Sequence, residues 1–275
     1  MRRIQTKSTT RSRRKSERLI NNRTARQRMD EGLRKAITKY RKAAKLAADS
    51  FGQAEEGPFL VATGISAFAF EQWSAIQEKK WQLFWNRATQ EVWLYGDPSR
   101  LHETAASHFI ATLGHLLESD AFRQVGVEGS PSLNIPDGIK QPDFAFGPLN
   151  QDDPTVVGEV AYHNESFKRL VEEEEMWCNA DYVHFFVGLK ITDRTRTQKT
   201  DPKLTLITWR RDTNESTKVE FGCNSECDEE GRMFLDIPVS CLFHQVQIPA
   251  SLSQQASISF DLYDLRQRCK KKIKN

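Results

Sequence analysis

The chain has 275 residues, enough to bury one sizeable core with an appendage, or two small cores. Hydrophobic residues make up 38% of it and charged residues 28%, a balance typical of globular proteins and unlike that of fibrous or wholly disordered chains. The net charge of +3 hides an uneven distribution, because residues 1–46 hold 17 of the 40 Lys and Arg but 3 of the 37 Asp and Glu. The sequence therefore joins a basic arm to an acidic body.

Neither a secretory signal nor a membrane span is predicted. The positive charges of the N-terminus are not followed by an apolar segment, and the most apolar window, residues 59–70, is too short to cross a bilayer. The 5 cysteines are an odd number without the spacing of a disulfide framework, which favours a reducing compartment. We expect a soluble, intracellular protein with no membrane partner.

Residues 1–50 form the predicted basic arm, disordered at first and then helical. Its first part holds a basic cluster of the kind that nuclear import or phosphate backbones select, so we expect a nuclear location. From about residue 23 the composition predicts a basic amphipathic helix. Its cations suit nucleic acid, an acidic protein surface, or solvent alone. The candidate nucleic-acid contacts in the arm are Arg11, Arg13, Arg14, Lys15, Arg23, Arg26 and Arg28.

Residues 51–98 are predicted to form a cap on the main domain. A helix is expected over residues 67–79, followed by two strands, 80–85 and 91–95, which alternate around a turn. The tryptophans of this hairpin are expected to pack inside it rather than to stack on bases.

The main domain is predicted over residues 99–265, with a basic tail over 266–275. Its expected order is a helix to about residue 119, a first strand within 124–135, strands 144–146 and 155–162, a helix 165–178 and a strand 182–189. Further short strands are expected up to residue 263. This order predicts an α/β fold with a mixed sheet flanked by helices.

Two acids lie against the apolar strands in the middle of this domain. Asp143 opens the first strand, and Glu159 lies within the second, inside a run of valines where an acid is costly to bury without a partner. Glu159 on an edge strand would face solvent instead. Alternatively, the two carboxylates meet at one end of the sheet, where a shared divalent cation would offset their repulsion.

At these residues the chain resembles the PD-(D/E)XK nuclease superfamily, and in particular a poorly characterised, largely fungal branch. Pro142-Asp143 matches the first half of the motif and Glu159 the second acid, and the likeness covers roughly residues 90–265. The resemblance implies a restriction-endonuclease-like fold, Mg²⁺ or Mn²⁺ as the cofactor, and DNA or RNA phosphodiesters as substrate. In this family the helix before the motif strands sometimes lends a further acid, for which Glu103 is the match.

One position departs from the motif. Its lysine falls at residue 161, which is alanine here, and alanine cannot polarise water or phosphate. Some relatives supply the cation from the following helix, and Lys168 is the replacement candidate, although charges on such a helix are commonly a solvated face. Three hypotheses follow: a metal-dependent nuclease using Asp143, Glu159 and Lys168; an inactive nuclease-fold module that binds nucleic acid or protein; or an interaction protein that recruits a partner through its basic arm.

Overall fold

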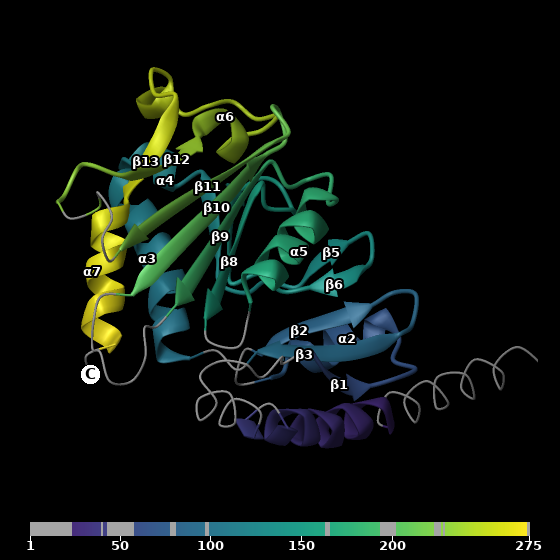
Figure 1. The fold of residues 1–275 in the computed structure, drawn as a ribbon. Coiled ribbons are helices and arrows are strands. Elements are labelled where there is room, and N and C mark those ends of the chain that lie inside the picture. The colour runs from purple at the N-terminus through teal and green to yellow at the C-terminus, as the bar shows by residue number, and fades with distance from the viewer. Residues whose placement is uncertain are drawn as a thin grey trace, which may run out of the picture.

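The computed structural model describes residues 24–39, 41–42, 58–77, 81–96, 99–162, 166–192, 202–222, 227 and 229–273. Its centre is a sheet of six strands in the order β11-β10-β9-β8-β7-β4 (Figure 1). The strands are β4 (Val125–Glu128), β7 (Phe144–Pro148), β8 (Val156–Tyr162), β9 (Phe185–Thr192), β10 (Lys203–Arg210) and β11 (Glu215–Gly222). Strands β8 and β9 run parallel, and every other neighbouring pair in this sheet is antiparallel.

Helices cover both faces of the six-stranded sheet. On one face, α3 (Arg100–Leu116) and α7 (Leu262–Ile273) lie side by side, and on the other lies α5 (Phe167–Cys178), as Figure 1 shows. The predicted fold class, a mixed α/β sheet flanked by helices, is confirmed. Since β8 and β9 are parallel, the chain must cross over between them, and α5 provides this crossover.

The side chains of β8 alternate between the two faces, and this alternation places Glu159. Val156 and Val160 join the core beneath α3, whereas Val157 and Ala161 join the core beneath α5. Because successive residues of a strand point to opposite faces, Glu159 points to the face covered by α5.

A second sheet of five strands, in the order β1-β3-β2-β6-β5, adjoins the first. Its strands are β1 (Phe59–Ala62), β2 (Gln82–Asn86), β3 (Glu91–Gly96), β5 (Leu133–Ile135) and β6 (Gly138–Lys140), and α2 (Ala67–Ser74) lies between β1 and β2 in the chain. The predicted hairpin is present as β2 and β3. The structure differs from the predicted 51–98 range of the cap, because β5 and β6 follow β4 in the chain yet pair with β2.

The helix predicted in the basic arm packs against this second sheet. Residues 24–39 are helical, and Met29, Leu33 and Ala36 are buried in one core with strands β1 to β3 and β6. A Cβ on Gly32 would lie 1.8 Å from the carbonyl oxygen of Val61, so only glycine permits this approach of helix to strand. The helical part of the predicted arm is therefore an integral layer of the cap.

The C-terminal segment completes the core on the α3 side. A two-stranded sheet of β12 (Phe234–Pro238) and β13 (Ser257–Asp261) precedes α7, and the short helices are α4 (Ser119–Phe122), α6 (Val239–Leu242) and the 3₁₀ turn η1 (Ala250–Leu252). The predicted basic tail, 266–275, begins inside α7, where Leu265 and Cys269 are buried. None of the described helices combines the length and the apolar character needed to cross a membrane.

Candidate functional site

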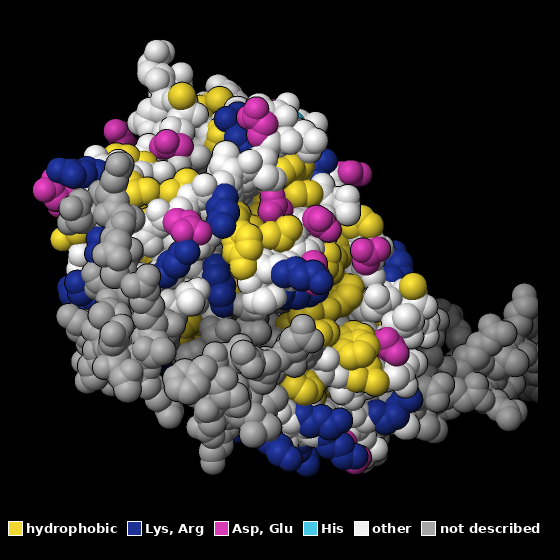
Figure 2. All heavy atoms as spheres, viewed as in Figure 1, with side chains coloured by type: hydrophobic (Ala, Val, Ile, Leu, Met, Phe, Trp, Pro, Cys, Tyr) yellow, Lys and Arg dark blue, Asp and Glu magenta, His cyan; other side chains and the backbone are white. Residues whose placement is uncertain are grey.

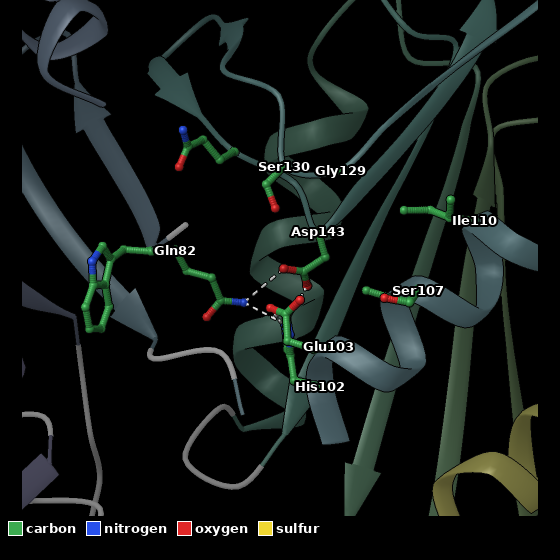
Figure 3. A pocket seen from close by; sticks show the side chains of 11 residues that line it. Gln82, His102, Glu103, Ser107, Ile110, Gly129, Ser130 and Asp143 are labelled. Atoms are coloured by element: carbon green, nitrogen blue, oxygen red, sulfur yellow. Dashed lines mark hydrogen bonds and ion pairs between the residues drawn. The ribbon is translucent and has the colours of Figure 1, made fainter. Parts of the chain in front are cut away.

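Asp143 is held where the two sheets and α3 meet. Its Oδ2 accepts a 2.6 Å hydrogen bond from the backbone N–H of Val160 and lies 2.9 Å from Nε2 of His102. Its Oδ1 accepts a 3.3 Å bond from Nε2 of Gln82, and that amide nitrogen is also 3.0 Å from Nε2 of His102 (Figure 3). Strand β8, helix α3 and strand β2 therefore all position this one carboxylate.

The electrostatic surroundings of Asp143 favour the charged form. Burial acts to raise the pKa of its carboxyl group, but the charge and hydrogen bond of His102, the hydrogen bond of the Val160 amide and the charge of Lys140 together outweigh it. The pKa of Asp143 is consequently lowered, and the group stays ionised at neutral pH.

A cavity of about 190 Å³ opens beside this carboxylate. Asp143 and Glu103 both line it, together with Gln82, Gln141 and Ser130 (Figure 3). The side chain of Glu103 is 60% exposed, and its Oε1 lies 3.7 Å from Nδ1 of the neighbouring His102. The structure thus brings two of the three predicted acids to one cavity.

The third predicted acid, Glu159, has different partners. Its Oε1 accepts bonds from the ammonium of Lys140 and, at 2.7 Å, from Nε1 of Trp177 on α5. Glu159 is 2% exposed and does not line the cavity beside Asp143. The two motif acids are therefore each held by a separate set of protein groups.

Lys140 and Glu159 belong to a buried charge network that links the two sheets to α5. The ammonium of Lys140 is 3.2 Å from Oε1 of Glu173, which is in turn 3.7 Å from the guanidinium of Arg169. The guanidinium carbon of Arg169 lies 4.2 Å from the centre of the Tyr95 ring on β3. Lys140, Glu159 and Glu173 are thus paired away from solvent, and Arg169, whose side chain is 22% exposed, extends the network toward the surface.

Burial affects both partners of the central pair. It acts to raise the pKa of Glu159, and Glu173 and Asp143 act in the same direction, whereas the charge and hydrogen bond of Lys140 favour the ionised carboxylate. For Lys140, burial acts to lower the pKa, but the charges of Glu159 and Glu173 outweigh it and raise the pKa. Lys140 therefore remains a cation facing two carboxyl groups.

The structure does not bring Lys168 to either motif acid. Its side chain is 88% exposed, and its ammonium lies 3.8 Å from Oε1 of Glu172 on the same helix. Ala161, at the position of the motif lysine, is buried, and Lys190 of β9 lies beside it in the register of the sheet. The cation bonded to Glu159 comes instead from β6, as Lys140.

Sequence reasoning missed Lys140 and Gln82 and assigned no role to His102. The sequence does contain a signal for Lys140. It follows Gly138 and Ile139 in a short strand, and a lysine that is buried in a strand needs a charged partner just as a buried acid does. Gln82 gave no such signal, because it lies 61 residues from Asp143 in an alternating strand.

The predicted nucleic-acid contacts lie partly within the described chain. Arg26 and Arg28 are exposed on the helix over residues 24–39, with Arg26 3.9 Å from Asp30. Arg28 donates a 3.4 Å bond to the carbonyl oxygen of Thr63. The remaining five, Arg11, Arg13, Arg14, Lys15 and Arg23, lie outside the described residues.

The donor set fits a metal ion only in part. A hard cation such as Mg²⁺ prefers several oxygen ligands, and Asp143 and Glu103 supply carboxylates on one cavity, whereas Glu159 is bonded to a lysine. Within the ranges that the structure describes, no group of three or more His, Cys, Asp or Glu side chains is placed to hold one metal ion. A cation shared by Asp143 and Glu159 therefore does not fit the residues present.

No model of a known protein family matches this sequence, and no curated protein matches it either. Among solved structures, the fold is similar to that of a protein from Anabaena variabilis described as a candidate nuclease belonging to DUF820. The TM-score is 0.47 at 10% sequence identity, and the likeness covers 74% of this chain and 99% of that chain. Membership of a largely fungal nuclease branch remains a prediction.

Proposed function

We propose that this chain is a nuclease-like protein that binds DNA or RNA but does not cleave it. In this proposal Asp143 and Glu159 do not share a catalytic metal ion. The observation that carries the proposal is the buried ion pair of Lys140 and Glu159. A metal ion on Glu159 would lie beside the ammonium of Lys140, which repels a second cation, and Oε1 of Glu159 already accepts bonds from Lys140 and Trp177. Lys140 also supplies the positive charge that a metal ion would bring.

The outer face of the helix over residues 24–39 supports binding of nucleic acid. Its inner side is fixed in the cap core by Met29 and Leu33, so the opposite side is held outward on a rigid layer. Cations on one helix face suit a phosphate backbone without specifying a sequence. The exposed bases of this helix and its continuation are Arg26, Arg28, Arg34, Lys35, Lys39, Arg41 and Lys42.

A second candidate function is a Mg²⁺- or Mn²⁺-dependent nuclease whose ion is held at the cavity alone. It is favoured by one observation, that Asp143 and Glu103 line the same cavity with the amides of Gln82 and Gln141. A bound ion would supply Lewis-acid activation of water and phosphate there. The protein's own contribution would be to keep Asp143 ionised and oriented through His102 and the Val160 amide.

Binding is tested by fluorescence anisotropy with labelled single- and double-stranded DNA and RNA, at about 50 mM and about 200 mM salt. The double variant Arg34→Glu, Lys39→Glu reverses two exposed charges of the helix. It should weaken binding and reduce the slope of log K against log salt by about one for each phosphate that the helix no longer neutralises. A truncation of the whole arm is unsuitable, because it would remove Met29 and Leu33 from the cap core.

The matched control is Arg123→Glu, Arg232→Glu, which makes the same charge change on the body of the protein, where both arginines are exposed. Equal weakening by both double variants would show that net charge alone matters. Absence of binding by the wild-type protein would overturn the proposal.

Cleavage distinguishes the two candidates. The leading proposal expects no metal-dependent cutting of DNA or RNA by the wild-type protein. The second expects cutting that is lost in Asp143→Asn and in Glu103→Gln but retained in a folded Glu159→Gln variant. Loss of cutting in a folded Glu159→Gln would instead favour the metal shared by Asp143 and Glu159, and would contradict both candidates.

A further inference from the structure

A groove of about 590 Å³ runs between α5 and the last two strands of the six-stranded sheet, and it shares no lining residue with the cavity beside Asp143. Its walls combine apolar and charged residues, and Figure 2 shows hydrophobic side chains between acidic and basic ones on this face of the molecule. The apolar lining includes Phe167, Val171 and Ile207, and the charged lining is Glu174, Glu175 and Lys218.

Glu174 is the unusual member of this lining. It is 7% exposed, and its Oε1 accepts a hydrogen bond from the hydroxyl of Ser216 on β11. Burial raises the pKa of Glu174, opposed by the Ser216 bond and assisted by the charge of Glu175. A buried carboxylate whose partner is a neutral hydroxyl remains costly for the free protein, because its charge is not compensated.

The cations around the groove are engaged elsewhere. The ammonium of Lys218 lies 3.3 Å from Oε1 of Glu220 and 4.7 Å from the centre of the Phe167 ring. The two preceding acids of α5 have ion pairs, Glu172 with Arg169 at 3.0 Å and Glu173 with Lys140 at 3.2 Å. Within the described chain, Glu174 has no ion pair of its own.

We propose that this groove binds a peptide segment of a partner protein, with a Lys or Arg side chain of that segment paired to Glu174. Apolar side chains of the segment would pack on Phe167, Val171 and Ile207, as in other grooves that combine an apolar floor with a charged anchor. The acids at the groove repel phosphate, so this surface is separate from nucleic-acid binding and does not depend on it. Charge complementarity selects the basic peptide.

The probe is a short fluorescein-labelled peptide that repeats Lys-Leu-Ser, and binding is followed by anisotropy with the full chain. Glu174→Gln keeps the shape and the capacity to bond Ser216 but removes the charge, and it should weaken binding by at least about tenfold. The control is Glu172→Gln, because Glu172 lies two residues before Glu174 on α5 but does not line the groove. This variant should bind the basic peptide as the wild-type protein does. A peptide that repeats Glu-Leu-Ser should not bind.

Thermal unfolding separates a binding role from a structural one. If the carboxylate of Glu174 serves to bind a partner's cation, Glu174→Gln removes a buried charge that has no ion pair within the described chain. The variant should then raise the temperature midpoint of unfolding by about 2 °C or more. A structural carboxylate would instead lower it. The proposal is overturned if the variant is less stable, if it binds the basic peptide as tightly as the wild-type protein, or if Glu172→Gln loses binding equally.

Discussion

The ammonium of Lys140 donates to Oε1 of Glu159, and both side chains are almost wholly removed from solvent. The pair joins β6 of the second sheet to β8 of the first, and Glu173 and Trp177 extend it to α5. Four side chains in contact therefore connect three layers of the molecule, around the acid that matches the second half of the nuclease motif. The energetic role of the pair can be measured independently of any activity.

Replacing Lys140 by methionine should strongly destabilise the protein. The change leaves Glu159 and Glu173 buried near each other without the cation between them, and breaking a buried pair from one side costs about 3–5 kcal/mol. Urea unfolding followed by tryptophan fluorescence gives the loss directly. Adding Glu159→Gln to the Lys140→Met variant should recover part of the lost stability, because one of the two uncompensated carboxylates is then neutral.

The matched control is Lys168→Met. Lys168 also lies near a glutamate, but its side chain is 88% exposed, so the loss should stay within about 0.5 kcal/mol. A Lys140→Met variant as stable as this control would mean that the buried pair does not hold the sheets together.

His108 should make the protein sensitive to mild acid. Its ring is buried between α3 and α7, where Nδ1 is 3.3 Å from the hydroxyl of Thr112 and Nε2 has no hydrogen-bond partner among the described residues. Burial lowers the pKa of His108 from the usual 6.5 to about 4, assisted by Arg268 and opposed by Asp264. A lowered pKa means that the unfolded chain binds the proton more readily, so stability is full above pH 6.5 and falls toward pH 4.

The variant His108→Gln should flatten this part of the pH profile. The wild-type free energy of unfolding should fall faster than that of the variant, by at most about 1.4 kcal/mol for each pH unit in the window. His115→Gln, an exposed histidine of the same helix, should keep the wild-type slope. Parallel profiles for wild type and His108→Gln would contradict the assignment.

Much of the main sheet could be predicted because its signals are local. Periodic apolar residues predict α3, and a nearly continuous apolar run predicts β9, since each pattern depends on neighbours a few residues apart. The same reasoning identified Asp143 and Glu159 as acids in apolar surroundings, and both are buried.

The partners of these acids could not be predicted, because they come from distant strands. Lys140 reaches Glu159 only because β6 pairs with β2, so that Lys140 lies opposite Phe84 in the second sheet. Periodicity within a strand does not say which sheet it joins, and a strand inserted between β4 and β7 would ordinarily be expected to extend the first sheet. The resemblance to the nuclease motif instead implies a replacement cation in the next helix, at Lys168.

The packing of the basic helix at Gly32 is another long-range contact that the sequence pattern does not predict. Its amphipathic composition predicts that one side of the helix is apolar, and the structure buries Met29 and Leu33 on that side. Nothing in the pattern showed what covers that side. The contact partner is the backbone of β1, at Val61. A glycine in the middle of a helix is the sequence signal that indicates such a close approach.

Replacing Gly32 by alanine should therefore destabilise the cap. Alanine is the better helix former by about 1 kcal/mol, so a helix that packs against nothing would become more stable through this change. Here the new Cβ would lie 1.8 Å from the carbonyl oxygen of Val61, and a backbone atom cannot rotate away. The helix must shift and loosen the packing of Met29, at a cost of about 1–3 kcal/mol or more.

Gly114→Ala provides the matched control, because Gly114 also lies inside a helix, α3, but its added Cβ would meet only the ring of Phe122, at 3.4 Å. It should leave stability unchanged or raise it by up to about 1 kcal/mol. The two variants make the same chemical change with opposite expected signs, and urea unfolding followed by tryptophan fluorescence reports both, since Trp73 donates to Asp30 of the docked helix. A gain of stability in Gly32→Ala would show that the helix does not dock against Val61.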